Sequence, residues 1–102
     1  MKEIILELQY FDDCPNVPIM YQNATDAMDS LDFDIELKNV VVADDAKAQR
    51  IGFRGSPTLL INGQDLLDMP KPENPSLSCR NYPNGVPTAE EIMEKIIKIY
   101  EE

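Results

Sequence analysis

Short apolar runs alternate with amphipathic stretches along the chain, a pattern typical of an α/β protein. Apolar and partly β-branched residues over 4–11 predict a buried strand, and the alternation of apolar with charged residues predicts a second strand over 33–42. A third strand is predicted at 58–61. The pair Asn62-Gly63 that follows favours a hairpin, so an antiparallel fourth strand is expected within 66–67, within 77–82, or in both.

Three helices are predicted between and after these strands. The first begins directly after Cys14-Pro15, and the second covers 44–51 and ends at Gly52, where a left-handed residue is favoured. The third follows a capping-box sequence at 88–91. The apolar residues of the first and third helices recur at intervals of three and four, which places them on one buried face. They are Val17, Met20, Ala24, Ala27, Met28 and Leu31 in the first helix, and Ile92, Ile96, Ile99 and Tyr100 in the third.

The predicted order is therefore β-α-β-α-β-β-α within a single domain, 1–102. Two parallel βαβ halves joined to a hairpin predict a mixed four-stranded sheet with helices on both faces, a three-layer α/β sandwich. The segment 68–87 contains five prolines, and so long a loop without structure is unusual in so small a domain.

Charge and composition exclude several classes of function. The net charge of −10, with no histidine, argues against binding to nucleic acid, which requires a basic face. No apolar run approaches the roughly 18 residues of a membrane span, and no signal peptide is recognised. We therefore expect a cytoplasmic monomer that does not bind membranes. Two cysteines without histidine are too few for a zinc site, so no metal or other cofactor is expected.

Two motifs resemble those of the thioredoxin-like superfamily. The segment AQRIGFRGSPTLLINGQ, residues 48–64, resembles the thioredoxin segment in which a helix ends, an R-G-x-P-T turn follows and a strand begins. Cys14-Pro15-Asn16-Val17 stands where that superfamily carries its C-x-x-C motif. The resemblance implies a thioredoxin-like fold and a cis Ser56–Pro57 bond beside Cys14. It also implies that substrates contact Pro15, Ser56 and Pro57, and pair as an extra strand with the exposed backbone of Ser56.

Cys14 is the candidate nucleophile. A cysteine at a helix N-terminus has its pKa lowered by the helix dipole and by free N–H groups, although the neighbouring Asp12 and Asp13 act in the opposite direction. Val17 occupies the position of the second cysteine of the motif, so the exchange cycle within C-x-x-C is impossible. The remaining candidates to resolve an intermediate are Cys79 and an external thiol.

The position of Cys79 follows from the predicted topology. On a fourth strand antiparallel to the third, Cys79 lies near the sheet edge that carries Cys14, two strand spacings or about 10 Å away. A disulfide requires Cα atoms about 4.4–6.8 Å apart, so a Cys14–Cys79 bond is expected to be less favoured than two separate thiols.

Three functions remain open. The first is thiol–disulfide exchange through Cys14, with or without Cys79, in which the partner is a protein or a small-molecule thiol or disulfide. The second is a non-catalytic module that binds a protein or peptide along Ser56-Pro57. The third is a dithiol site for a soft metal such as mercury or Cu(I), or for arsenite.

Overall fold

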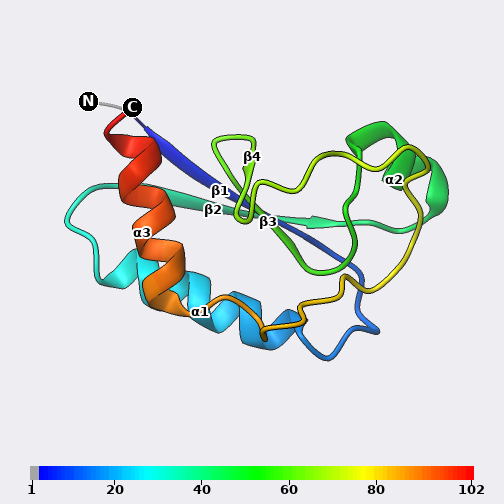
Figure 1. The fold of residues 1–102 in the computed structure, drawn as a ribbon, viewed down its shortest axis with the longest axis horizontal. Helices are drawn as coiled ribbons and strands as arrows, with labels where there is room; N and C mark the ends of the chain where they lie inside the picture. The colour runs from blue at the N-terminus through cyan, green and yellow to red at the C-terminus, as the bar shows by residue number, and fades with distance from the viewer. Residues whose placement is uncertain (1–2) are drawn as a thin grey trace.

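The structure, a computed structural model, describes residues 3–102 and confirms the predicted order of elements. The strands and helices differ from their predicted bounds by two residues or fewer, except for the fourth strand. They are β1 (Ile4–Tyr10), α1 (Val17–Asp29), β2 (Ile35–Val41), α2 (Asp45–Ile51), β3 (Thr58–Ile61), β4 (Gln64–Asp65) and α3 (Ala89–Tyr100). Figure 1 shows their arrangement.

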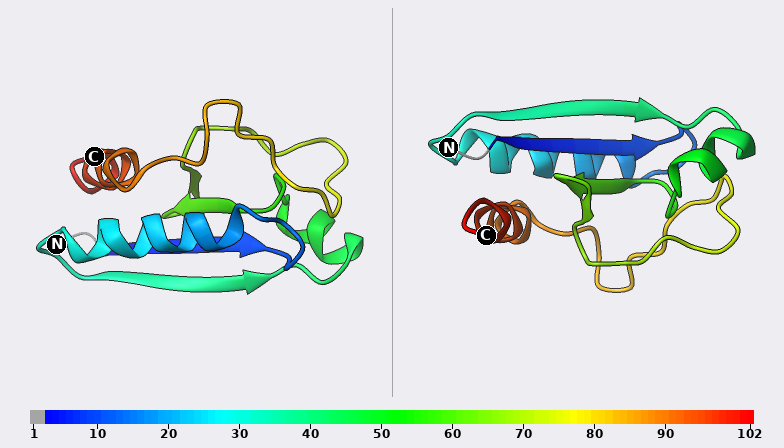
Figure 2. Two further views of the ribbon diagram at one scale, coloured as in Figure 1. Left: turned by 90° about the horizontal axis from the view of Figure 1, so that it is seen from below. Right: turned by 90° about the horizontal axis from the view of Figure 1, so that it is seen from above.

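The four strands form one mixed sheet, as predicted, and their order in it is β2-β1-β3-β4. β1 and β2 are parallel, with Ile4 opposite Ile35, and the antiparallel pairing of β1 with β3 places Leu8 opposite Leu59. The two views of Figure 2 show β2, β1 and β3 side by side. The antiparallel pairing of β1 with β3 brings the carboxyl end of β1 and the start of β3 to the same edge of the sheet.

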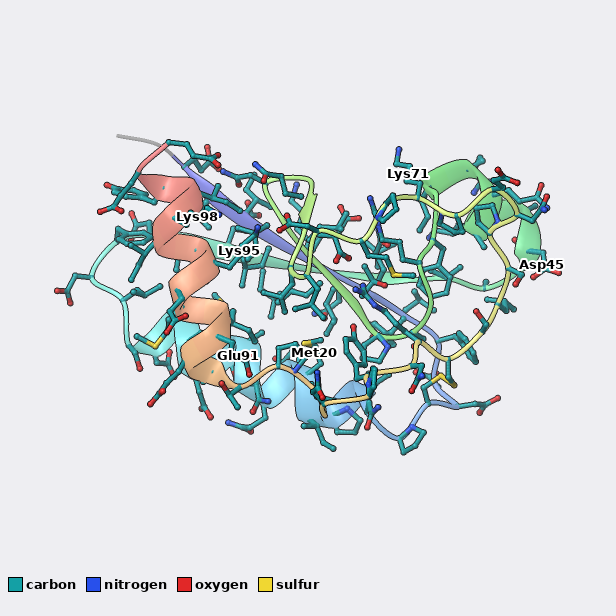
Figure 3. All side chains as sticks on the ribbon, in the orientation of Figure 1. Met20, Asp45, Lys71, Glu91, Lys95 and Lys98 are labelled. Atoms are coloured by element: carbon teal, nitrogen blue, oxygen red, sulfur yellow. A yellow bond between two sulfur atoms is a disulfide. The ribbon has the colours of Figure 1, made fainter. Side chains whose placement is uncertain are left out.

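α1 and α3 pack on one face of the sheet and enclose the main core with it. α1 runs along the strands, whereas α3 runs across their direction (Figures 1 and 2). Met20 lies between α1 and the rest of the core (Figure 3), and the capping box of Thr88 with Glu91 fixes the start of α3. The buried apolar residues of this core are Ile4, Leu6, Leu8, Met20, Ala24, Ala27, Leu59, Ile61, Leu66, Ile92, Ile96 and Ile99.

The prediction of helices on both faces is wrong for the second face. α2 lies beyond the carboxyl end of β2, at the opposite end of the molecule from α3 (Figure 1), and forms a separate small cluster around Phe53. The sheet face that α1 and α3 do not cover carries Glu7, Gln9, Thr58 and Asp65, because these residues alternate with the core residues or pair across the strands. This polar face also holds Ile5, Val40 and Leu60, and none of the described helices packs on it.

The predicted positions of the fourth strand are also wrong. β4 follows directly after the Asn62-Gly63 turn, where both residues have positive φ, and it ends at Asp65. The carboxylate of Asp65 accepts hydrogen bonds from the backbone N–H groups of Leu67 and Met69, at 2.9 and 3.0 Å, and so turns the chain out of the sheet. Residues 77–82 form no strand. They contribute a single-residue β-bridge, between Cys79 and Ser56, which is parallel rather than antiparallel.

The sequence also predicts that no segment is apolar enough, over a sufficient length, to span a membrane. None of the helices within residues 3–102 combines the length and the apolar character needed to cross a bilayer.

Candidate functional site

Cys14 and Cys79 are joined by a disulfide, with an S–S distance of 2.09 Å and Cα atoms 5.8 Å apart. The expectation that the two thiols stay apart is therefore wrong. It assumed that Cys79 lies on an antiparallel fourth strand, whereas Cys79 belongs to the long loop after β4 and pairs with Ser56 in a parallel bridge. The loop brings the Cα atoms of the two cysteines within the range that a disulfide requires.

The two cysteines differ in exposure. Cys14 lies in the turn between β1 and α1, two residues before the N-cap residue Asn16, and only 3% of its surface is exposed. Its carbonyl accepts a hydrogen bond from the N–H of Val17, at 3.2 Å. Cys79, in contrast, is exposed. The disulfide thus joins a buried residue of the sheet edge to a residue at the surface.

The backbone of Ser56 is hydrogen-bonded to another segment of the same chain. The Ser56–Pro57 bond is cis, which confirms the prediction, but Ser56 is 1% exposed rather than open to a substrate. Its N–H donates to the carbonyl of Ser78 at 2.8 Å, and its carbonyl accepts from the N–H of Arg80 at 2.9 Å. The backbone edge expected to receive a substrate strand therefore already carries the residues on either side of Cys79.

We call residues 77–82 the strap, because they hold Cys79 over this edge through side chains as well as backbone. The guanidinium of Arg80 donates two hydrogen bonds to the carboxylate of Asp65, at 2.7 and 3.0 Å, and both residues are buried. The hydroxyl of Tyr82 donates to the carbonyl of Pro57, and the guanidinium of Arg80 lies 5.1 Å from the centre of the Tyr82 ring. The strap is therefore anchored on the polar face of the sheet.

The hydroxyl of Ser56 makes a second connection, to the end of β1. The N–H of Phe11 donates to the Ser56 Oγ at 3.1 Å, and this hydroxyl lies 3.3 Å from the carbonyl of Phe11, to which it donates. Phe11 is three residues before Cys14, so the turn that carries Cys14 is held against the turn that carries Ser56.

The pKa shifts of Asp65 and Arg80 favour their charged forms, and that of Tyr82 favours its neutral phenol. Burial alone would raise the pKa of Asp65, but the hydrogen bonds from Arg80, Met69 and Leu67 and the charge of Arg80 outweigh it and lower that pKa. Burial also opposes the charge on Arg80, yet the hydrogen bond from its guanidinium to Asp65 raises the pKa of Arg80. Burial raises the pKa of Tyr82 to about 12, with Arg80 lowering it and Asp65 raising it.

Gly55 allows the strap to approach the sheet. Its φ is +103°, which side chains rarely adopt, and a Cβ atom there would lie 2.9 Å from both the Cα and the Cβ of Arg80. The absence of a side chain at Gly55 thus leaves space beside Ser56, and the protein's own strap uses that space.

The structure brings together four of the five site residues predicted from the sequence. Cys14, Cys79, Ser56 and Pro57 share one edge of the sheet, where Pro57 is buried, and Pro15 is exposed in the adjacent turn. The sequence reasoning missed the residues that anchor the strap, Asp65, Arg80 and Tyr82. A charged residue beside the apolar pair Leu66-Leu67 was the available signal, but no spacing rule pairs Asp65 with a residue fifteen positions later.

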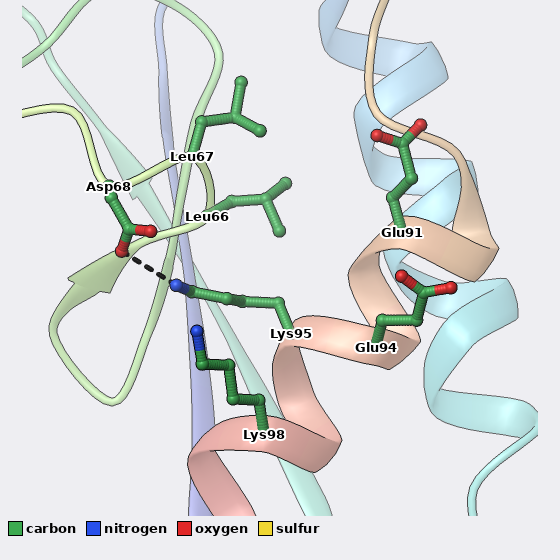
Figure 4. A pocket seen from close by; sticks show the side chains of 7 residues that line it. All are labelled: Leu66, Leu67, Asp68, Glu91, Glu94, Lys95 and Lys98. Carbon is green, nitrogen blue, oxygen red and sulfur yellow. Dashed lines mark hydrogen bonds and ion pairs between the residues drawn. The ribbon is translucent and has the colours of Figure 1, made fainter.

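The hollow between α3 and the turn after β4 is separate from these residues. It has a volume of about 390 Å³, and Figure 4 shows the ion pair of Lys95 with Asp68, 2.7 Å long, at its side. Figure 3 places Lys95 and Lys98 at the end of the molecule opposite Asp45, which accepts a hydrogen bond from the strap residue Leu77. Residues 3–102 also contain no group of three or more His, Cys, Asp or Glu placed to hold a metal ion.

Comparisons of the chain with known protein families, with curated proteins and with solved structures found no match. Function is therefore inferred from the geometry around Cys14 and Cys79.

Proposed function

We propose that the protein carries out thiol–disulfide exchange and that Cys14 and Cys79 are its redox pair. The observation that carries the proposal is the disulfide between them, which leaves Cys79 exposed beside the Ser56–Pro57 turn. The order of elements, the mixed sheet and the cysteine before α1 support a thioredoxin-like fold as part of the same proposal.

The exchange requires only thiols and disulfides. A partner thiolate attacks one sulfur of the Cys14–Cys79 bond, which breaks, and the other cysteine leaves as a thiolate that takes up a proton. A second partner thiolate then attacks the mixed disulfide and releases an oxidised partner together with the dithiol protein. Two partner thiols lose two electrons, and the protein disulfide gains them. In the reverse direction the dithiol protein reduces a partner disulfide.

The expected setting of this reaction is a cytoplasmic monomer that acts without a cofactor on protein or small-molecule thiols and disulfides. Glutathione and thioredoxin systems keep cytosolic thiols reduced, so a disulfide that forms there is usually catalytic or redox-sensing. That setting favours a reversible role for the Cys14–Cys79 bond over a permanent structural one.

A dithiol soft-metal site is the second candidate, because reduction would leave two thiols adjacent at Cys14 and Cys79. Two thiolates suit Cu(I), mercury or arsenite, and binding would release protons from the thiols. The non-catalytic module has less support, because a peptide could pair with Ser56 only after displacing the strap. Titration of the reduced protein with Cu(I), followed by proton release, separates the metal site from redox exchange.

Catalysis of insulin reduction by dithiothreitol tests the proposal. We expect the wild type to accelerate the reaction, and Cys14→Ser and Cys79→Ser each to lose most of the acceleration. Ser78→Ala is the matched control, because Ser78 contributes only its backbone carbonyl to the bridge with Ser56. The proposal fails if the double variant Cys14→Ser/Cys79→Ser is as active as the wild type.

A further inference from the structure

Cys14 and Cys79 differ in exposure, and this difference bears on which sulfur of the disulfide a partner thiolate attacks. A thiolate attacks a disulfide at one sulfur and expels the other, and access decides which sulfur is attacked when one is covered. Cys14 is 3% exposed, whereas Cys79 is exposed on the strap. We infer that Cys79 is the sulfur that exchanges with the partner and that Cys14 is the buried sulfur that leaves and later resolves the mixed disulfide. This assignment rests on the proposed function and reverses the roles expected from the sequence.

The segments around Cys14 are held together by hydrogen bonds that do not involve the disulfide. The β1–α1 turn is tied to Ser56 by the two hydrogen bonds between Phe11 and the Ser56 hydroxyl. Ser56 is in turn tied to the strap by its backbone N–H and carbonyl. The turn, Ser56 and the strap therefore form one hydrogen-bonded unit to which both Cys14 and Cys79 belong.

The strap keeps its anchors when the disulfide is broken. Arg80, the residue after Cys79, makes two charge-assisted hydrogen bonds to the buried Asp65, and pairs of this geometry are among the strongest in proteins. Tyr82 adds its bond to the carbonyl of Pro57. None of these contacts involves sulfur, so reduction leaves Cys79 beside Cys14 with Cys14 still covered.

With these roles the exchange runs in a fixed order. A partner thiolate attacks the Cys79 sulfur, the Cys14–Cys79 bond breaks, and Cys14 leaves as a thiolate and is protonated. The partner is now bonded to Cys79. A second partner thiolate then attacks the sulfur of the bound partner, forms the partner disulfide and expels the Cys79 thiolate, which takes up a proton. Alternatively, the Cys14 thiolate attacks the Cys79 sulfur, expels the partner as a thiolate and restores the starting disulfide. The strap thus holds the mixed disulfide on Cys79 next to the resolving thiol of Cys14, at high effective concentration.

Mapping the first intermediate tests the assignment. The oxidised wild type is treated briefly with glutathione, quenched with acid, blocked with N-ethylmaleimide and digested for mass spectrometry. We expect glutathione on Cys79 and N-ethylmaleimide on Cys14. Glutathione on Cys14, or an equal division between the two cysteines, would overturn the inference.

Single-cysteine variants test it even if the wild-type disulfide resists attack, a result that would defeat the proposed function and not the assignment. We measure iodoacetamide alkylation from pH 7 to 11 and compare the plateau rate constants, which removes differences in thiol pKa. Because buried groups react only through local opening, Cys14 in Cys79→Ser should react at least roughly tenfold more slowly than Cys79 in Cys14→Ser. Equal plateau rates, or a faster Cys14, would refute the assignment.

A third variant checks that the strap provides the cover. Added to Cys79→Ser, Asp65→Asn removes the ionic partner of Arg80 and should raise the alkylation rate of Cys14. Asp68→Asn is the matched control, since Asp68 forms its ion pair with Lys95 on α3 and not with Arg80. Equal rates in these two variants would show that the strap does not shield Cys14.

Discussion

At the scale of single residues, Asp65 and Arg80 account for the position of Cys79. The pair is buried on the polar face of the sheet, and each partner is expensive to bury without the other. Asp65 also accepts the backbone bonds that end β4. One carboxylate thus terminates a strand and anchors the strap that carries a redox cysteine.

We expect Asp65→Asn to lower the free energy of unfolding by roughly 3–5 kcal/mol, because it leaves the charge of Arg80 buried without a partner. Asp68→Asn removes an ion pair whose carboxylate is exposed and should lower the free energy of unfolding by at most about 1 kcal/mol. Urea denaturation at pH 7 measures both. Equal losses in the two variants would contradict the role given to Asp65.

The same carboxylate predicts an acid dependence. The pKa of Asp65 is lowered in the folded protein. Its contribution to the free energy of unfolding is therefore complete above the unfolded pKa of about 3.9 and is lost as pH falls toward the folded pKa. Between those values the unfolded chain binds a proton that the native protein does not. The free energy of unfolding of the wild type should fall across this interval, more steeply than that of Asp65→Asn.

Tyr82 predicts an alkaline dependence of the opposite sign. Burial raises its pKa to about 12. Its contribution to the free energy of unfolding is therefore complete below the unfolded pKa of about 10 and is lost as pH rises toward about 12. An absorbance titration of phenolate formation should show a step near pH 12 that is missing from Tyr82→Phe. If the two titrations coincide above pH 11, the phenol of Tyr82 is not buried as described.

At the scale of elements, the strap depends on a close approach to the turn before β3. Gly55 meets the backbone of Arg80 at distances that leave no room for a methyl group. The approach lets Arg80 reach Asp65 and places Cys79 over Cys14. The turn and the strap therefore form a single structural unit, although Pro57 and Leu77, their nearest residues in sequence, are 20 positions apart.

Gly55→Ala should lower the free energy of unfolding and weaken the Cys14–Cys79 pairing, because the added methyl group displaces Arg80. Gly63→Ala is the matched control: Gly63 also has positive φ, but nothing lies within 4 Å of the position that an added methyl group would take. Both variants carry the backbone cost of about 1–2 kcal/mol, and only Gly55→Ala adds the clash. We measure urea denaturation and the fraction of disulfide in a fixed glutathione buffer. Equal disulfide fractions in the two variants would contradict the close-approach argument.

Elements with strong local signals could be predicted from the sequence, and the strap could not. The apolar run at 58–61, the Asn62-Gly63 turn and the capping box at 88–91 each specify their structure through neighbouring residues. The strap has almost no pairing with a strand and depends on one ion pair between distant charges. The loop 68–87, which contains the strap and five prolines, shows no helical or strand periodicity in its apolar residues, so its course could not be predicted. The disulfide of Cys79 was missed for the same reason.

At the scale of the whole molecule, the disulfide joins two distant parts of the sequence that meet at the sheet edge. It links residues 65 positions apart, and closing a loop of that size stabilises a folded chain by about 4 kcal/mol in the chain-entropy account. The non-covalent anchors of the strap favour the same closed arrangement. Folding and disulfide formation therefore support each other, and a partner can shift one by acting on the other.

A redox titration of the folded protein tests the central claim most directly. The protein is equilibrated in glutathione and dithiothreitol buffers of increasing reducing power, quenched with acid, and its free thiols are counted by alkylation and mass spectrometry while circular dichroism monitors the fold. We predict one two-electron transition from an intramolecular Cys14–Cys79 disulfide to a folded dithiol, with a midpoint above about −300 mV, the limit below which structural disulfides typically lie. A disulfide that persists below that limit, one that is reduced only when the protein unfolds, or two cysteines that never pair within one chain would contradict the claim.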